Sequence, residues 1–177
     1  VGEWYMHTET HPEGLKDVSE AAKKAGMKLM LWLEPERARK GMEIVTSHPD
    51  WYLTLPDDTN CILNYGNKEA WEYVHNLLSN YIEELDLGCY RQDFNVELTE
   101  FFKQNDEPDR RGITEIKHIM GMYDLWDKLL QKHPGLLIDN CASGGRRFDI
   151  ETLKRSIAFF RSDYFCNYTA DPEVIQV

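Results

Sequence analysis

At residues 87–95 the chain reads Leu87-Gly88-Cys89-Tyr90-Arg91-Gln92-Asp93-Phe94-Asn95. This run is apolar at its start and ends in a carboxylate, which is typical of a buried strand that brings Asp93 to the rim of a sheet, where α/β proteins carry their chemistry. A second run, residues 156–163, has the same design and ends in Asp163. Two strand-end carboxylates suggest an acid/base pair.

Helical and extended segments alternate around these two runs. Apolar residues at helical spacing predict helices over residues 15–25, 67–85, 114–132 and 150–155. Short apolar runs predict strands over residues 27–33, 87–93, 136–139 and 156–163, the first of them buried on both faces. Residues 37–60 and 96–112 are expected to be loops. This order indicates parallel β/α units with right-handed crossovers.

The predicted strand ends carry the reactive residues Trp32, Glu34, Asp93, Asn95, Cys141, Ser143 and Asp163. Four strands make either a small open sheet or an arc of a (β/α)8 barrel, and barrels keep catalytic residues at strand carboxyl ends, so the pattern favours the arc. A complete barrel takes about 250 residues. We therefore expect residues 1–177 to form a single partial catalytic (β/α)8 TIM barrel domain of the α/β class, truncated at both ends and holding roughly strands 3 to 6 with their helices.

The composition excludes several classes of function. The net charge is −11, with 31 acidic and 20 basic residues and no basic cluster, so nucleic acid is not an expected partner. No apolar run approaches the roughly 20 residues that a membrane span needs, so no membrane is expected. No metal is expected either, because the four cysteines form no Cys-x-x-Cys pair and the six histidines are scattered. We expect no cofactor, reduced thiols and a cytoplasmic location, and the start at Val1 without Met suggests a piece of a longer chain.

Four motifs occur in order along the chain: Leu31-Trp32-Leu33-Glu34-Pro35-Glu36, Arg91-Gln92-Asp93-Phe94-Asn95, Cys141-Ala142-Ser143-Gly144-Gly145-Arg146-Arg147-Phe148-Asp149 and Arg161-Ser162-Asp163. Together they resemble the melibiase-type α-galactosidases, glycoside hydrolase family 36 of clan D. In that family Trp-x-Glu-Pro-Glu, Lys-Trp-Asp-x-Asn, Cys-x-Ser-Gly-Gly-x-Arg-Phe-Asp and Ser-Asp strand ends follow one another on a (β/α)8 barrel. The resemblance covers about residues 2–165, nearly the whole chain.

The resemblance implies a retaining glycoside hydrolase that cleaves terminal α-galactosides by a double-displacement mechanism. Asp93 would be its nucleophile and Asp163 its general acid/base. Beside the sugar the resemblance puts Trp32, Arg91, Asn95, Cys141 and Gly144. The implied partners are an oligosaccharide or glycoside substrate and the remaining barrel strands, from the parent chain or from a homo-oligomer. A further Asp pair that grips the galactose hydroxyls would lie upstream of Val1.

Glycoside hydrolysis needs one carboxylate to attack the anomeric carbon and one carboxylic acid to protonate the leaving oxygen. Arg91 lies two residues before Asp93 on the same strand face, so its charge would keep Asp93 ionised. Arg161 stands in the same relation to Asp163, which must hold a proton near neutral pH. The guanidinium of Arg161 is therefore expected to bind substrate instead.

The sequence alone allows two roles for each of three further residues. Ser143 and Gly144 could cradle a phosphate, but the more typical use of such a turn is close approach of the backbone to a sugar hydroxyl. Glu34 stands at a strand tip because Pro35 ends the pairing there, and it is either a substrate ligand or a structural hydrogen-bond partner.

Three alternatives stay open. The family's Lys-Trp before the nucleophile is Arg91-Gln92 here, which could change the preferred sugar to an N-acetylgalactosaminide or an arabinopyranoside. The chain could instead be a non-catalytic carbohydrate-binding fragment that keeps the aromatic residues of the groove. An isolated barrel arc would also have exposed edge strands and could be inactive alone.

Overall fold

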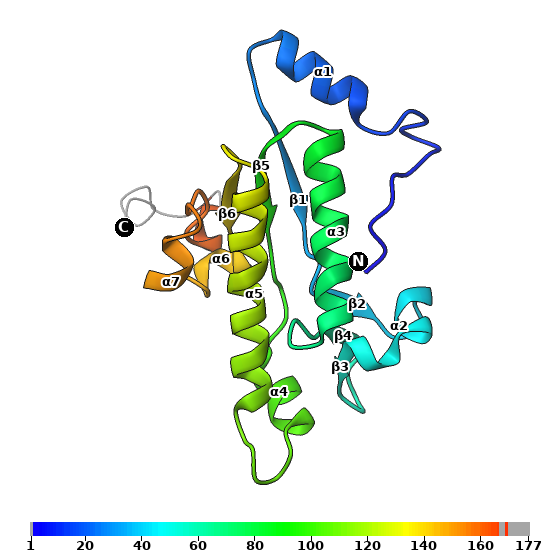
Figure 1. Ribbon diagram of the computed structural model, residues 1–177, viewed down its shortest axis with the longest axis vertical. Coiled ribbons are helices and arrows are strands. Elements are labelled where there is room, and N and C mark those ends of the chain that lie inside the picture. The colour runs from blue at the N-terminus through cyan, green and yellow to red at the C-terminus, as the bar shows by residue number, and fades with distance from the viewer. Residues whose placement is uncertain (1, 167–168, 170–177) are drawn as a thin grey trace.

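The computed structural model describes residues 2–166 and 169. Within these residues a parallel sheet of three strands has the order β1-β5-β6, formed by Leu29–Leu33, Leu87–Gln92 and Leu137–Asn140. Two long helices, α3 (Lys68–Glu84) and α5 (Ile113–Lys132), lie in front of these strands in Figure 1. The predicted α/β class and its parallel strands are therefore confirmed.

The two faces of the parallel sheet differ in burial. Tyr90 of β5 lies beside Ile138 of β6, and both are almost fully buried in one cluster with the apolar side chains of α3 and α5. On the opposite face Met30 and Leu137 are each 47% exposed. The prediction that residues 27–33 are buried on both faces is wrong, because no described element covers the second face of β1.

Helix α3 begins where the sequence supplies an N-cap. The side chain of Asn67 accepts hydrogen bonds from the backbone N–H groups of Glu69 (2.9 Å) and Ala70 (3.2 Å), two of the amides that a helix start leaves unpaired. Buried apolar residues then recur every four positions, at Ala70, Val74, Leu78 and Ile82. Each large side chain buried in this way contributes about 1.5–3 kcal/mol, which holds the helix on the sheet.

A second, antiparallel sheet follows β1 directly. Its strands in the order β2-β4-β3 are Arg37–Arg39, Asn60–Leu63 and Tyr52–Thr54. The helices between β2 and β3 are α2 (Glu43–Ser47) and η1 (Pro49–Trp51). The prediction of a loop over residues 37–60 is therefore wrong, because pairing between strands distant in sequence outweighs the local turn signals.

Shorter elements complete the described part of the chain: α1 (Lys16–Lys24), α4 (Thr99–Asn105), α6 (Ala142–Gly145), α7 (Ile150–Leu153) and η2 (Asp163–Cys166). The predicted helices at residues 15–25 and 150–155 are confirmed as α1 and α7. Helix α4 lies inside the predicted loop of residues 96–112, which is wrong there because Phe101 and Phe102 are buried and draw the segment into a helix.

The fourth predicted strand, residues 156–163, is reduced to a single bridge. Ile157 pairs in parallel with Asp139 and makes two backbone hydrogen bonds to β6, of 2.8 and 3.0 Å. The chain then leaves the sheet, because the amide of Phe159 donates to the carboxylate of Asp139 (3.0 Å) rather than to another strand. The strand prediction is therefore wrong over most of its length, and Asp163 begins η2 instead of ending a strand.

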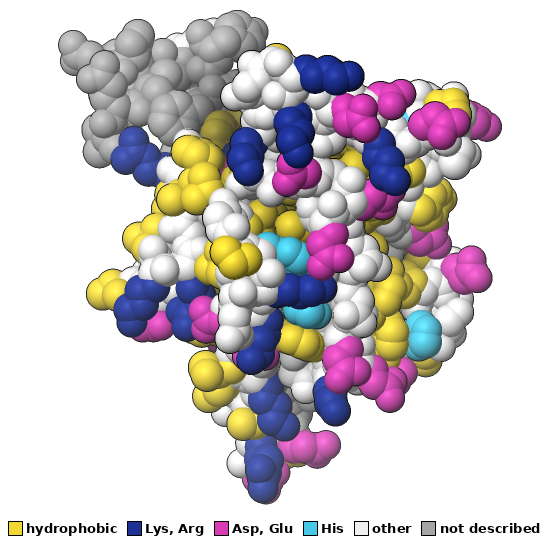
Figure 2. Space-filling model, turned by 45° about the horizontal axis from the view of Figure 1, so that its top comes forward, with side chains coloured by type: hydrophobic (Ala, Val, Ile, Leu, Met, Phe, Trp, Pro, Cys, Tyr) yellow, Lys and Arg dark blue, Asp and Glu magenta, His cyan; other side chains and the backbone are white. Residues whose placement is uncertain are grey.

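The surface carries both signs of charge. On the face shown in Figure 2, acidic and basic side chains are interspersed with apolar ones. Over the part of the chain that the structure describes, no helix combines the length and apolar character needed to cross a membrane.

Candidate active site

Asp93 follows β5 directly and is surrounded by hydrogen-bond donors. Its Oδ2 accepts from the indole Nε1 of Trp32 at 3.0 Å. Its Oδ1 accepts from the backbone amides of Phe94 (2.8 Å) and Ser143 (3.3 Å). The carboxylate therefore receives donors from β1, from its own loop and from the turn that follows β6.

These donors determine the charge of Asp93. Burial alone would raise the pKa of this carboxyl, but hydrogen bonds from Asn95, Trp32 and the backbone of Phe94 and Ser143 outweigh it, and the pKa lies below its ordinary value. Asp93 is therefore an ionised carboxylate at neutral pH. A carboxylate in this state can act as a nucleophile.

The segment after β6, labelled α6, is a left-handed turn rather than a regular helix. Its residues have positive φ values at Ala142 (+50°), Ser143 (+50°), Gly144 (+74°) and Gly145 (+96°). A Cβ atom on Gly144 would lie 3.0 Å from Cγ and 3.1 Å from Oδ1 of Asp163, so glycine is what permits this approach. The amide of Ser143 faces Asp93 and the bare Cα of Gly144 faces Asp163, so the two carboxylates flank one turn.

Asn95 is fixed from two directions. The hydroxyl of Ser143 lies within hydrogen-bond distance of the Asn95 Oδ1 atom (2.8 Å) and the carbonyl oxygen of Phe94 (3.1 Å). The backbone N–H of Asn95 donates to Oε1 of Glu34 at 2.6 Å. Glu34 is fully buried and pairs with Arg37 at 2.6 Å, so its carboxylate is engaged by protein groups in this structure.

Arg91 shares the sheet face of Asp93 but pairs with a different carboxylate. Its Nη1 donates to Oδ2 of Asp139 at 2.6 Å, and its Nη2 donates to the Sγ of Cys141 at 3.3 Å. Asp139 is fully buried. The prediction that Arg91 keeps Asp93 ionised is wrong, because this guanidinium is engaged by Asp139 and hydrogen bonds lower the pKa of Asp93.

The remaining predicted site residues differ in exposure. Cys141 is buried, and burial raises the pKa of its thiol, which is therefore neutral at physiological pH. Trp32 is 42% exposed and lies edge-on to Trp4, with ring centroids 6.3 Å apart. Arg161 and Asp163 have exposed side chains. Asn95 is also exposed, so the open groups at this end of the sheet are an indole, a guanidinium, a carboxylate and a carboxamide.

A buried ionic cluster centred on Glu36 was not predicted from the sequence. Both oxygens of this fully buried carboxylate accept hydrogen bonds from the guanidinium of Arg147, at 2.6 and 2.7 Å. Gln92 (2.7 Å) and His118 (2.9 Å) also contact it. Burial would raise the pKa of Glu36, but Arg147 and His118 overcome that effect and hold it well below the ordinary value. The doubled Arg146-Arg147 after the glycine turn was the available signal for this cluster.

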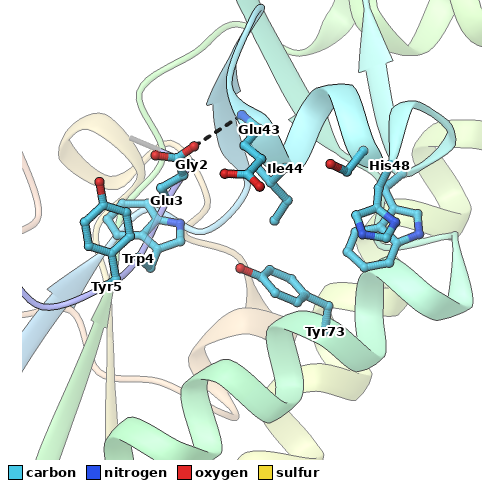
Figure 3. A pocket seen from close by; sticks show the side chains of 10 residues that line it. Gly2, Glu3, Trp4, Tyr5, Glu43, Ile44, His48 and Tyr73 are labelled. Atoms are coloured by element: carbon cyan, nitrogen blue, oxygen red, sulfur yellow. Dashed lines mark hydrogen bonds between the residues drawn. The ribbon is translucent and has the colours of Figure 1, made fainter.

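A pocket of about 460 Å³ opens elsewhere, between the N-terminal segment, α2, η1 and α3. Figure 3 shows Tyr5 and Tyr73 on its walls and the carboxylate of Glu3 accepting from the backbone of Glu43 at 3.2 Å. None of the residues that line this pocket belongs to the site around Asp93 and Asp163. Over residues 2–166 and 169, no group of three or more His, Cys, Asp or Glu side chains is arranged to hold a metal ion.

The sequence model of the family described as Melibiase matches residues 1–168. An α-galactosidase of Escherichia coli is 30% identical over 169 residues, which are 92% of this chain and 23% of that protein. The crystal structure of the α-galactosidase from Lactobacillus brevis aligns with a TM-score of 0.81 and 31% identity, covering 92% of this chain and 23% of that one.

A variant of the family 36 α-galactosidase AgaA from Geobacillus stearothermophilus, solved with stachyose, aligns with a TM-score of 0.81 and 25% identity over 92% of this chain and 24% of that one. The chain thus spans about a quarter of the length of the relatives it matches. Since the family match runs from before β1 to beyond Asp163 and includes every strand end described above, this chain belongs to the melibiase family.

Proposed function

We propose that this chain forms part of the active site of a retaining α-galactosidase, with Asp93 as nucleophile and Asp163 as general acid/base. The observation that carries the proposal is the turn between the two carboxylates. The Ser143 amide lies 3.3 Å from Oδ1 of Asp93, while a Cβ on Gly144 would be 3.1 Å from Oδ1 of Asp163. Two carboxylates on one turn, one of them with a lowered pKa, suit the two roles that glycoside hydrolysis requires.

In the first step, an oxygen of Asp93 attacks the anomeric carbon and the bond from that carbon to the leaving oxygen breaks. Asp163 donates its proton to this oxygen, so the aglycone leaves as a neutral alcohol. In the second step, Asp163 takes a proton from water, the water oxygen attacks the anomeric carbon, and the bond to Asp93 breaks. The two inversions release galactose with its original α configuration.

Trp32 has two uses in this mechanism. Its Nε1 donates to Asp93 and favours the ionised carboxylate, while its half-exposed ring offers an apolar surface for a sugar face. We assign the remaining sugar contacts to residues around the same turn and strand ends: Arg91, Asn95, Cys141, Ser143, Gly144 and Arg161. Glu34 supports this set from below by fixing the backbone of Asn95.

We also propose that β1, β5 and β6 are neighbouring strands of a (β/α)8 barrel, within a single domain. The exposed face with Met30 and Leu137 would then be the barrel interior. It also carries the partly buried Arg91–Asp139 pair, and barrels fill their interior with side chains from neighbouring strands. The remaining strands of a longer chain, or those of a second copy, would cover this face.

The test uses the protein that contains this segment, with nitrophenyl α-galactoside as substrate. Asp93→Asn and Asp163→Asn are each expected to lower kcat by several orders of magnitude, whereas Asp109→Asn, at an exposed loop carboxylate, is expected to leave it unchanged. A nitrophenyl panel that includes the N-acetylgalactosaminide and the arabinopyranoside would define the sugar. Wild-type kcat in Asp93→Asn would refute the proposed nucleophile and favour a carbohydrate-binding role.

Azide separates the two carboxylate roles. In Asp93→Gly, azide should attack the anomeric carbon directly from the face opposite the leaving group and give the β-galactosyl azide. In Asp163→Gly, the galactosyl bond to Asp93 still forms with an activated leaving group, and azide then displaces Asp93 to give the α-galactosyl azide. The opposite pattern of products would show that the two roles are exchanged.

A further inference from the structure

The buried pair between Glu36 and Arg147 joins segments that are 111 positions apart. Both carboxylate oxygens are engaged by separate guanidinium nitrogens, Nη1 at 2.6 Å and Nη2 at 2.7 Å. This planar, two-point contact fixes direction as well as distance, which a lysine could not reproduce. The other contacts of Glu36, from Gln92 of β5 and His118 of α5, tie the pair to the core of the fold.

Arg147 also contacts the ends of two strands. Its guanidinium carbon lies 4.5 Å from the ring centre of Phe94, the residue after Asp93. Its carbonyl oxygen accepts from Nδ2 of Asn140, the last residue of β6, at 3.1 Å. One arginine thus connects the segment after β1, the loop after β5 and the end of β6.

The left-handed turn at residues 142–145 precedes Arg147 by two residues. Ala142 and Ser143 both have φ of +50° without being glycine, a conformation that persists only where surrounding structure enforces it. We infer that the Glu36–Arg147 pair positions this turn, and through it the Ser143 amide at Asp93 and Gly144 against Asp163. The inference rests on the function proposed above for these two carboxylates. Glu36 and Arg147 are positioning residues, because neither touches the reacting atoms.

Relaxation of the turn would change the pH dependence of the reaction. The groups around the Asp93 carboxylate are Trp32 from β1, Asn95 from its own loop, the Cys141 thiol and the Ser143 amide from the end of β6, and Asp163 across the turn. Arg91, two residues before Asp93 in the chain, faces Asp139. If the turn relaxes, Asp93 loses the Ser143 donor and its pKa rises. The acidic limb of kcat/KM then moves to higher pH.

The test is Arg147→Lys in the full protein, with Arg155→Lys as the matched control. Arg155 makes a comparable two-point pair with Asp127 (2.7 and 2.9 Å) and lies 5.0 Å from the ring centre of Tyr123, but it does not contact the turn. With nitrophenyl α-galactoside, Arg147→Lys is expected to lower kcat about tenfold or more, to change KM little, and to move the acidic limb upward. Arg155→Lys should change none of these.

Hydrogen–deuterium exchange of the segment 140–148 gives a readout that is independent of catalysis. It should be faster in Arg147→Lys than in wild type and unchanged in Arg155→Lys. If Arg147→Lys does not fold, Glu36→Asp, which keeps the charge and retracts it by one methylene, is measured in the same way. Wild-type exchange and an unmoved acidic limb in the folded variant would overturn the inference. Full activity in Asp93→Asn would instead overturn the proposed function, whatever the exchange shows.

Discussion

Gly144→Ala tests the geometry of the turn with the smallest possible change. The added Cβ would lie 3.0 Å from Cγ of Asp163 and closer still to its backbone nitrogen, whereas ordinary contact begins at 3.4 Å. Because backbone cannot swing aside as a flexible side chain can, Asp163 must retreat from the turn by several tenths of an ångström. The position also has φ of +74°, so alanine adds backbone strain.

The two effects have different magnitudes and different readouts. Left-handed strain should lower the free energy of unfolding by about 1–2 kcal/mol. Catalytic groups have to be held within about 0.5 Å, and a displacement of 1 Å can cost about 100-fold, so the retreat of Asp163 should lower kcat by about 10- to 100-fold. Each tenfold loss corresponds to about 1.4 kcal/mol of transition-state stabilisation.

Gly26→Ala is a matched control because Gly26 has nearly the same φ, +73°, and no atom within 4 Å of the position its Cβ would take. The assay is hydrolysis of nitrophenyl α-galactoside by the full protein, with thermal unfolding measured in parallel. Both variants should lose stability through left-handed strain, Gly144→Ala more than Gly26→Ala because of its clash with Asp163, and only Gly144→Ala should lose activity. Equal kcat in the two variants would refute the proposed contact between the turn and the general acid/base.

Three further measurements address other parts of the structure. Trp32→Phe removes the indole donor to Asp93, so the pKa of this carboxylate should rise and the acidic limb of kcat/KM should move to higher pH; an unmoved limb would exclude that role. Glu36→Gln leaves Arg147 without its buried partner and should lower the free energy of unfolding at pH 7 by about 3–5 kcal/mol, as measured by urea denaturation. Because folding lowers the pKa of Glu36, its contribution is present above the unfolded pKa of about 4.3 and is lost as pH falls below it. Wild type should therefore lose more stability on acidification than Glu36→Gln, and parallel pH profiles would contradict this. Asn67→Ala removes the N-cap of α3 and should lower the free energy of unfolding by about 1 kcal/mol. An unchanged midpoint of urea denaturation would contradict this.

The sequence predicted those features whose causes are local. Helix α3 starts at a capping Asn67 and buries a stripe at helical spacing, so both its beginning and its orientation could be derived from neighbouring residues. The strand before Asp93 could also be predicted, because a short apolar run followed by a carboxylate is typical of a buried strand that ends at the rim of a sheet. Four short motifs in a fixed order then indicated the family, which the match over residues 1–168 confirms.

Features that depend on distant partners could not be predicted. Glu36 and Arg147 are 111 positions apart, and the doubled arginine at residues 146–147 indicates a basic site without showing which carboxylate it meets in the core. The strand over residues 156–163 failed for a similar reason, since its pairing ends where the Asp139 carboxylate captures the amide of Phe159. The same aspartate engages Arg91, so one unpredicted buried carboxylate accounts for both errors.

The left-handed turn at residues 142–145 is costly by itself, and its contacts explain why it persists. The φ of +50° at Ala142 and Ser143 costs each residue about 1–2 kcal/mol, which glycine would avoid. A glycine in place of Ser143, however, would have no hydroxyl to reach Asn95 and the backbone of Phe94. The turn offers a peptide N–H to one carboxylate and a missing side chain to the other, which no relaxed right-handed turn of the same residues would do. Its strain is therefore the condition for both contacts, and a rigid support such as the Glu36–Arg147 pair is required to maintain it.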